Sequence, residues 1–130
     1  SAYGEGQIEN SLKTPLGEHE IKTKIGTDVP KYQFFVSREH ISQEVDIIEK
    51  EIDSPDDFIT TRIMWLAGKN EGFNSGGNVD SFQRFIYIHG THEEGLIGKK
   101  ASHGCIRMLN HDVLELFRII PTKTAVNIYL

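Results

Sequence analysis

Phe85-Ile86-Tyr87-Ile88-His89-Gly90-Thr91 is the run around which the rest of this chain can be arranged. Its nearly continuous apolar part is typical of a strand covered on both faces, and we predict such a strand over residues 82–88. His89-Gly90-Thr91 then lies at the C-terminal end of that strand. Rigid scaffolds present reactive side chains at such ends and in the loops that follow them.

Four other segments have the composition or the alternation of strands. They are residues 19–26, 32–36, 60–66 and 125–130. Between the third of these and the central run, residues 69–81 are rich in Gly and Asn, and we expect an exposed, mobile loop there. The pattern as a whole predicts a mainly β fold.

Two segments have the pattern of helices instead. In residues 38–53, apolar side chains recur at spacings of four, three and four among many charges, which predicts an amphipathic helix capped by Ser37. A second helix is predicted to begin at Asn110 as its cap and to end at Pro121. The 130 residues fit one domain, 1–130, with a mainly β architecture and these two helices.

Charge and hydropathy exclude several classes of partner. The chain has 14 Lys and Arg against 19 Asp and Glu, a net charge of -5, and no basic stripe, so we exclude nucleic acid. No apolar run approaches the ~20 residues that a membrane-spanning helix needs. The first residues lack the features of a signal peptide, which leaves the mature part of an exported protein or a piece of a longer chain.

Ser102-His103-Gly104-Cys105-Ile106-Arg107 places the only cysteine beside a histidine, a glycine and an arginine. A thiol has a reference pKa of ~8.5 and is mostly protonated at neutral pH, so positive charge and a nearby base favour the nucleophilic thiolate. Gly104 leaves room for a substrate carbonyl to approach the sulfur. The N–H groups of Gly104 and Cys105 are candidates for an oxyanion hole.

His89 is the candidate base for that thiol. It stands at a strand end directly before Gly90, and a base of this kind needs a third group that fixes its tautomer. A backbone carbonyl can fill that role where no acidic partner is available. The combination of Cys105 and His89 therefore predicts nucleophilic cysteine chemistry.

These residues resemble the catalytic signature of the YkuD-like L,D-transpeptidase domain. That signature is His-Gly at a strand end, a loop, then Ser or Thr followed by His-Gly-Cys, often with Ile-Arg next. Ile88-His89-Gly90-Thr91 and residues 101–108 match it, and Thr14-Pro15-Leu16-Gly17 resembles the Thr-Pro-x-Gly segment of the family. The resemblance covers nearly the whole chain. The family's N-terminal strand and hairpin precede this segment, so we expect that strand to be missing here.

The resemblance implies two β-sheets packed around the site, a helix after the cysteine segment, and an enzyme without a metal or other cofactor. Cys105 would attack the amide between the third residue, a diamino acid, and the fourth, D-Ala, of a peptidoglycan stem peptide. D-Ala would leave, and a side-chain amine of a second stem would resolve the acyl-enzyme into a 3-3 crosslink. Carbapenems would acylate the same thiol, and the protein would act in the periplasm or cell envelope.

The resemblance also implies a role for each motif residue. His89 would be the base, and the backbone carbonyl of Gly90 would be the third member of the catalytic set. The others would shape the oxyanion side, bind substrate or order the loop: Ser102, His103, Gly104, Arg107 and Thr91.

Three alternatives stay open at this point. The first is a zinc site, whose spacing matches no known finger, made of His89, His92, His103 and Cys105. The second keeps the acyl-enzyme but resolves it with water, giving an L,D-carboxypeptidase that trims tetrapeptides to tripeptides. The third is a wall-binding module without activity, against which the intact pair of Cys105 and His89 argues.

Overall fold

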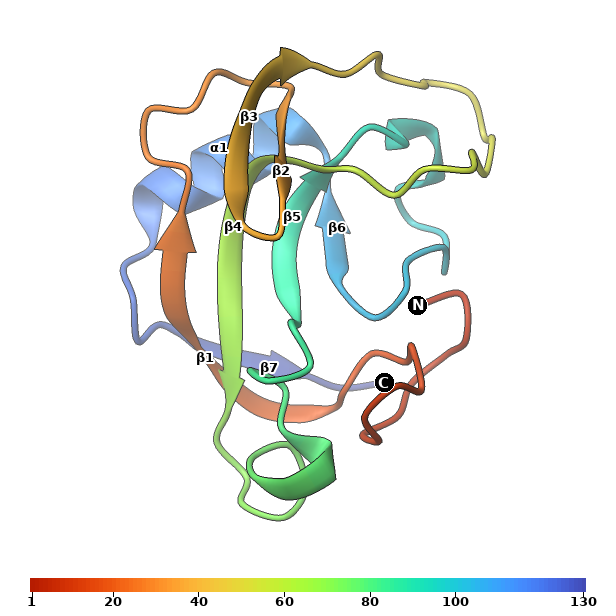
Figure 1. The fold of residues 1–130 in the computed structure, drawn as a ribbon. Coiled ribbons are helices and arrows are strands. Elements are labelled where there is room, and N and C mark those ends of the chain that lie inside the picture. The colour runs from red at the N-terminus through yellow and green to blue at the C-terminus, as the bar shows by residue number, and fades with distance from the viewer.

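The computed structural model describes residues 1–130 and confirms the predicted mainly β architecture (Figure 1). One α-helix and two short 3-10 turns accompany seven strands. The elements are β1 (Gly17–Ile25), β2 (Gln33–Val36), β3 (Glu39–Glu44), β4 (Ile59–Gly68), η1 (Gly77–Val79), β5 (Tyr87–Thr91), η2 (Glu94–Leu96), β6 (Ile106–Met108), α1 (Asn110–Ile119) and β7 (Ala125–Ile128).

The long strand β4 joins the two halves of the sheet. β1 pairs with its second half and β2 with its first two residues along the same edge, while β5 pairs with the opposite edge. The two packed sheets that we expected are therefore connected by hydrogen bonds through β4 into one seven-stranded sheet, with β7, β3 and β6 at its margins. The pairings between these strands are all antiparallel except that of β5 with β6.

Thr61 marks the point where β4 passes from one half to the other. The register of β4 against β5 shifts between Thr60 and Ile63, and Thr61 has a φ of 69°, which is rare for a β-branched residue. Its hydroxyl donates to Asn110 Oδ1 at 2.6 Å and accepts from the Tyr32 N–H at 3.0 Å. Side-chain hydrogen bonds thus hold the bulge in place.

The sheet has two differently used faces. On one face, α1 contributes Val113 and Phe117 to a core that contains Ile88 of β5. On the other face, Tyr87 packs in a smaller cluster, against which Cys105 lies. Because side chains alternate along a strand, His89 points to the same face as Tyr87 and away from α1.

The predicted helix over residues 38–53 is wrong. Residues 39–44 form strand β3, which pairs with β2 as a hairpin, and Ser37 is a turn residue instead of a cap. Ser37 and Arg38 have φ values of 46° and 68°, the left-handed conformation of a two-residue hairpin turn. Because isoleucines spaced for a helix also suit a hairpin and an irregular segment, the apolar spacing alone did not separate these outcomes.

Residues 45–58, which we call the strap, contain neither helix nor strand. The strap crosses the loop after β5: the Ile48 N–H donates to His92 O at 2.8 Å, and the Gly95 N–H donates to Ile48 O at 2.9 Å. A Cβ at Gly95 would lie 2.0 Å from Lys50 O, so only glycine allows this approach. The strap therefore lies on the loop that leads from His89 towards Cys105.

Two further predictions need correction. Residues 82–85 form a turn in which Phe85 has a φ of 58°, so the predicted strand over 82–88 begins only at Tyr87. The loop 69–81 is not exposed throughout, because Asn74 and Ser81 are completely buried. Asn74 Nδ2 donates to Leu16 O and Glu18 O at 3.1 and 3.0 Å, which fixes the loop against β1.

No helix in the structure combines the length and the apolar character needed to cross a membrane. The single α-helix has ten residues.

Three buried histidines should make the fold sensitive to mild acid. Burial lowers the pKa values of His19, His89 and His92 below the ordinary value of 6.5. Below pH 6.5 the unfolded chain therefore takes up protons that the folded chain refuses, so the free energy of unfolding falls as pH decreases. We expect the urea midpoint to decline between pH 7 and 5, and the His19→Gln variant to show a shallower decline. A midpoint that rises or stays level over this range would contradict the expectation.

Candidate active site

The parallel pairing of β5 with β6 brings the two candidate catalytic residues to one face of the sheet. His89 lies opposite Arg107, and Ile88 lies opposite Ile106. Cys105 directly precedes β6, so alternation directs it, like Arg107, to the face that carries His89. The topology therefore places together the His89 and Cys105 that the sequence singled out.

The thiol rests against the beginning of β5. The Tyr87 N–H donates to Cys105 Sγ at 3.3 Å, and the Sγ–H donates to Phe85 O, also at 3.3 Å. In this resting position the thiol proton is held by a backbone carbonyl. A rotation of the Cys105 side chain is therefore needed before its proton can pass to His89.

Burial of the sulfur raises the pKa of Cys105 from an ordinary 9.0 to about 12, and the hydrogen bond from Tyr87 opposes this rise only partly. The residue as a whole is still partly exposed, so a substrate can reach it. At neutral pH the resting group is thus a thiol. Its attack on a carbonyl requires a base that takes the proton during the reaction.

His89 has the geometry of that base. It is completely buried, and its Nδ1–H donates to Gly90 O at 2.5 Å. This bond fixes the tautomer and leaves Nε2 as a free acceptor. Burial lowers the pKa of His89, which keeps the imidazole neutral and ready to accept a proton.

The loop that carries Cys105 is held by Ser102. Its hydroxyl donates to Cys105 O at 2.6 Å and accepts from the Gly104 N–H at 3.3 Å. Thr14 Oγ1 donates to Gly104 O at 3.0 Å, and Gly104 has a φ of 123°, which favours glycine. Of the two N–H groups predicted for an oxyanion hole, that of Gly104 is engaged by Ser102. The N–H of Cys105 has no intramolecular partner.

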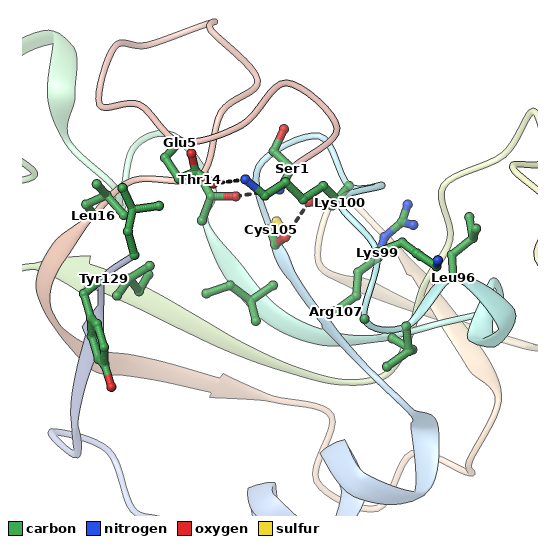
Figure 2. A pocket seen from close by; sticks show the side chains of 16 residues that line it. Ser1, Glu5, Thr14, Leu16, Leu96, Lys99, Lys100, Cys105, Arg107 and Tyr129 are labelled. Atoms are coloured by element: carbon green, nitrogen blue, oxygen red, sulfur yellow. Dashed lines mark hydrogen bonds and ion pairs between the residues drawn. The ribbon is translucent and has the colours of Figure 1, made fainter.

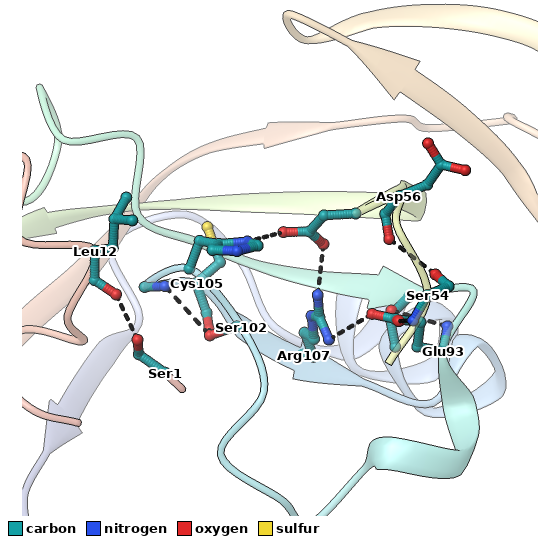
Figure 3. A network of polar contacts seen from close by, with 12 residues as sticks. Ser1, Leu12, Ser54, Asp56, Glu93, Ser102, Cys105 and Arg107 are labelled. Atoms are coloured by element: carbon teal, nitrogen blue, oxygen red, sulfur yellow. Dashed lines mark hydrogen bonds and ion pairs between the residues drawn. The ribbon is translucent and has the colours of Figure 1, made fainter. Parts of the chain in front are cut away.

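Arg107 is an organising residue inside the protein. Its side chain is only 8% exposed and forms ion pairs with Asp57 at 2.7 Å and Glu93 at 3.0 Å (Figure 3). Asp57 also accepts from His103 Nδ1 at 2.9 Å. Burial alone would raise the pKa of Asp57, but His103 and Arg107 hold it below its usual range. Of the two predicted roles for Arg107, these contacts favour ordering the loop over contacting substrate.

Glu93 extends this network into the strap. Its side chain is 1% exposed, and Oε2 accepts from the Ser54 N–H at 2.6 Å. Ser54 Oγ in turn bonds His92 Nε2 at 2.9 Å. The loop that carries Cys105 and the strap are thus connected through Arg107. Sequence reasoning missed this link because no motif marks Asp57 or Glu93.

Thr91 lies away from the opening of the site. It is completely buried, its hydroxyl accepts from the Glu93 N–H at 3.1 Å, and its carbonyl accepts from Asn110 Nδ2 at 2.8 Å. The structure therefore places this predicted substrate-binding residue in the scaffold. His103, by contrast, is exposed beside Cys105.

A cavity of about 310 Å³ opens beside Cys105 (Figure 2). Ser102, Arg107 and the chain around Lys99 and Lys100 line it. The two lysines pair with Glu51 and Glu5 and are exposed, as expected of a solvated pair. The loop that carries the thiol thus borders this cavity.

Residues 2–128 match the family model described as YkuD: L,D-transpeptidase catalytic domain. The chain belongs to this L,D-transpeptidase family.

Individual relatives match over shorter stretches. The L,D-transpeptidase domain is 58% identical over 41 residues to a putative L,D-transpeptidase YkuD of Bacillus licheniformis, which covers 32% of this chain and 25% of the relative. It is 41% identical over 73 residues to a putative L,D-transpeptidase YqjB of Bacillus subtilis, covering 56% of this chain and 36% of the relative. A probable L,D-transpeptidase YbiS of Escherichia coli is 44% identical over 43 residues, covering 33% and 14%. The matches thus span between about a seventh and a third of these relatives.

The residues of the zinc alternative do not gather in this L,D-transpeptidase domain. The structure contains no group of three or more His, Cys, Asp or Glu side chains arranged to hold a metal ion. His92 instead bonds Ser54 and packs edge-on against Phe58, with ring centroids 4.8 Å apart. His103 bonds Asp57.

The raised pKa of Cys105 predicts slow reaction with simple alkylating agents. With a pKa of about 12 in place of 9.0, the thiolate fraction at pH 8 falls on the order of 10³-fold. Since a more basic thiolate is also more nucleophilic, we expect alkylation by iodoacetamide to be roughly 10²-fold slower than in the urea-unfolded chain. Intact-mass time courses measure both rates. Equal rates would contradict the expectation, because they would indicate a preformed thiolate.

Proposed function

We propose that this domain is a peptidoglycan L,D-transpeptidase that forms 3-3 crosslinks through an acyl-enzyme on Cys105. The observation that carries the proposal is the fixed tautomer of His89. Its Nδ1–H is committed to Gly90 O, and its free Nε2 lies on the face that also carries the thiol. Family membership supplies the substrate class, and the protein would act on it in the periplasm or cell envelope.

The first half-reaction forms the acyl-enzyme and releases D-Ala. The thiol of Cys105 turns from Phe85 O to His89 Nε2, which takes its proton as the sulfur attacks the carbonyl of the third stem residue. The Cys105 N–H, which has no intramolecular partner, stabilises the oxyanion. The imidazolium of His89 then donates its proton to the nitrogen of D-Ala, and the amide bond breaks.

The second half-reaction transfers the acyl group. A side-chain amine of a second stem attacks the thioester carbonyl and gives its proton to His89. The C–S bond then breaks, and the sulfur of Cys105 takes the proton from the His89 imidazolium. Water in place of the amine would give an L,D-carboxypeptidase that uses the same residues. The acceptor thus decides between the two activities.

Two measurements test the proposal. Incubation with a carbapenem should add one equivalent to the wild-type chain and none to Cys105→Ala, as read by intact mass. A stem tetrapeptide should give crosslinked dimers and D-Ala. Tripeptide without dimers would replace transfer by hydrolysis. If the folded protein gave neither adduct nor product, the proposed enzymatic activity would be wrong and a wall-binding module would be favoured.

A further inference from the structure

A cluster of aromatic rings lies beside the thiol, and we call it the aromatic platform: Trp65, Phe82 and Phe85. Trp65 stacks on Phe82, with centroids 4.0 Å apart and planes at 11°, and lies 5.9 Å from the Phe85 ring. Phe85 is 50% exposed although its carbonyl accepts from Cys105 Sγ. The platform therefore reaches solvent at the place where an acyl donor must arrive.

Arg38 lies over this platform. Its guanidinium carbon is 5.2 Å from the Trp65 ring centroid and 4.8 Å from that of Phe85, both within the range of cation–π contacts. Nη1 donates to the Tyr87 hydroxyl at 3.0 Å. Two rings and a phenol thus hold the guanidinium in one orientation.

The charge of Arg38 has no acidic partner. None of the five ion pairs in the structure includes it, whereas Arg107 has two carboxylates. A guanidinium has five N–H donors, and one contact from Nη1 to the Tyr87 hydroxyl uses only a part of them. A fixed, partly exposed cation with free donors is suited to a carboxylate of the ligand.

Tyr87 connects the guanidinium of Arg38 to the thiol of Cys105. Its N–H binds Cys105 Sγ, and its hydroxyl binds Arg38 Nη1. Arg38 Nη1 therefore lies one tyrosine side chain plus a hydrogen bond of 3.0 Å from the backbone beside the sulfur, roughly 10 Å or three extended residues along an extended path. A carboxylate at the end of the side chain of the attacked residue reaches that position.

The hairpin turn presents Arg38 to the site. Both residues of the turn between β2 and β3 adopt left-handed φ values, and the turn lies in front of β4 and β5 (Figure 1). An arginine is an uncommon choice for a left-handed position, where Asn or Gly is preferred. At this position the arginine side chain makes the contacts with Trp65, Phe85 and Tyr87, which Asn or Gly could not make.

We infer that Arg38 binds a carboxylate on the side chain of the third stem residue, so that donors in which this carboxylate is free are preferred to donors in which it is amidated or absent. The inference rests on the proposed function and adds to it the residue that recognises the side chain of the donor. A third residue that ends in an amine alone, or in an amide, would leave the guanidinium without its partner.

Paired donors test the inference. We would measure kcat and KM for D-Ala release from a tetrapeptide with diaminopimelate and from the same peptide with the side-chain carboxylate amidated. The wild type should prefer the free carboxylate by roughly 10- to 100-fold, as expected for a hydrogen bond between charged groups. Arg38→Gln should lose that factor through KM with the free carboxylate only, while Arg38→Lys should keep part of it.

A matched control is Lys22→Gln, because Lys22 lies 5.1 Å from the Phe82 centroid on the same platform without a contact to Tyr87. Lys22→Gln should leave kcat and KM unchanged for both donors. Equal losses with both donors in Arg38→Gln would mean a structural role for Arg38, and no loss would mean no role. Either result overturns the inference.

A binding measurement separates this inference from the proposed function. In a Cys105→Ala background, calorimetry with the two tetrapeptides reports affinity without chemistry. A preference for the free carboxylate that Arg38→Gln abolishes would support the role of Arg38 even if the wild type released no D-Ala. Turnover without a preference for the free carboxylate would be consistent with the proposed enzymatic activity but would show that the role inferred for Arg38 is wrong.

Discussion

His89→Gln is expected to lower kcat/KM for acylation by roughly 10²- to 10⁴-fold, the usual contribution of a positioned general base. Glutamine can keep a hydrogen bond near Gly90 O but cannot accept the thiol proton. Since burial raises the pKa of Cys105 to about 12, almost no thiolate forms without a base. Stopped-flow acylation by a carbapenem measures the loss directly.

The histidine of the cysteine motif, His103, provides the control for this experiment. His103→Gln removes an exposed ring that bonds Asp57 and does not hold the Gly90 carbonyl, so its effect should be much smaller. Thermal melts of both variants separate unfolding from lost chemistry. Similar losses in the two variants would refute the assignment of His89 as the base.

Asn110→Ala is expected to lower the free energy of unfolding by about 3 kcal/mol, through several buried groups left without partners. Asn110 is completely buried. Its Oδ1 accepts from Thr60 and Thr61 at 2.5 and 2.6 Å, and its Nδ2 donates to Thr91 O and Glu94 Oε2 at 2.8 and 2.9 Å. One amide thus connects the bulge of β4, the end of β5 and the loop after it.

Urea unfolding at pH 7.5 measures this effect. Asn127→Ala is the matched control, because Asn127 is exposed on β7 and its loss should cost no more than about 0.5 kcal/mol. Equal destabilisation by the two substitutions would show that the Asn110 network contributes little. The sequence predicted Asn110 as a helix cap, but the structure shows no such cap bond and uses its side chain between strands.

The sequence was informative where pattern and contact are local. Alternation predicted β1 and β7, and the apolar face before Pro121 predicted α1, because each element buries residues at its own period. The hairpin at 33–44 was missed because its deciding feature is the left-handed turn at Ser37 and Arg38, which these residue types do not signal.

The same limit applies to the candidate site. His89 and Cys105 stand in short motifs, and the parallel pairing of β5 with β6 explains why those motifs meet. The partners of Arg107 come from the strap and from the end of β5, which only tertiary packing brings together. No periodicity or spacing marks Asp57 or Arg38, so a single sequence gave no sign of either.

The alternation of side chains along β5 limits how such a site can be altered or transplanted into another protein. Deleting or inserting one residue between Tyr87 and His89 would turn the imidazole into the core beneath α1 and bring an isoleucine out beside the sulfur. The strand could still pair, but a polar imidazole would then lie in an apolar core and the thiol would lose the imidazole beside it. A change of length within these three residues therefore separates the imidazole from the thiol. A designer who grafts the site must first preserve which residues of β5 point to each face of the sheet, and only then match distances.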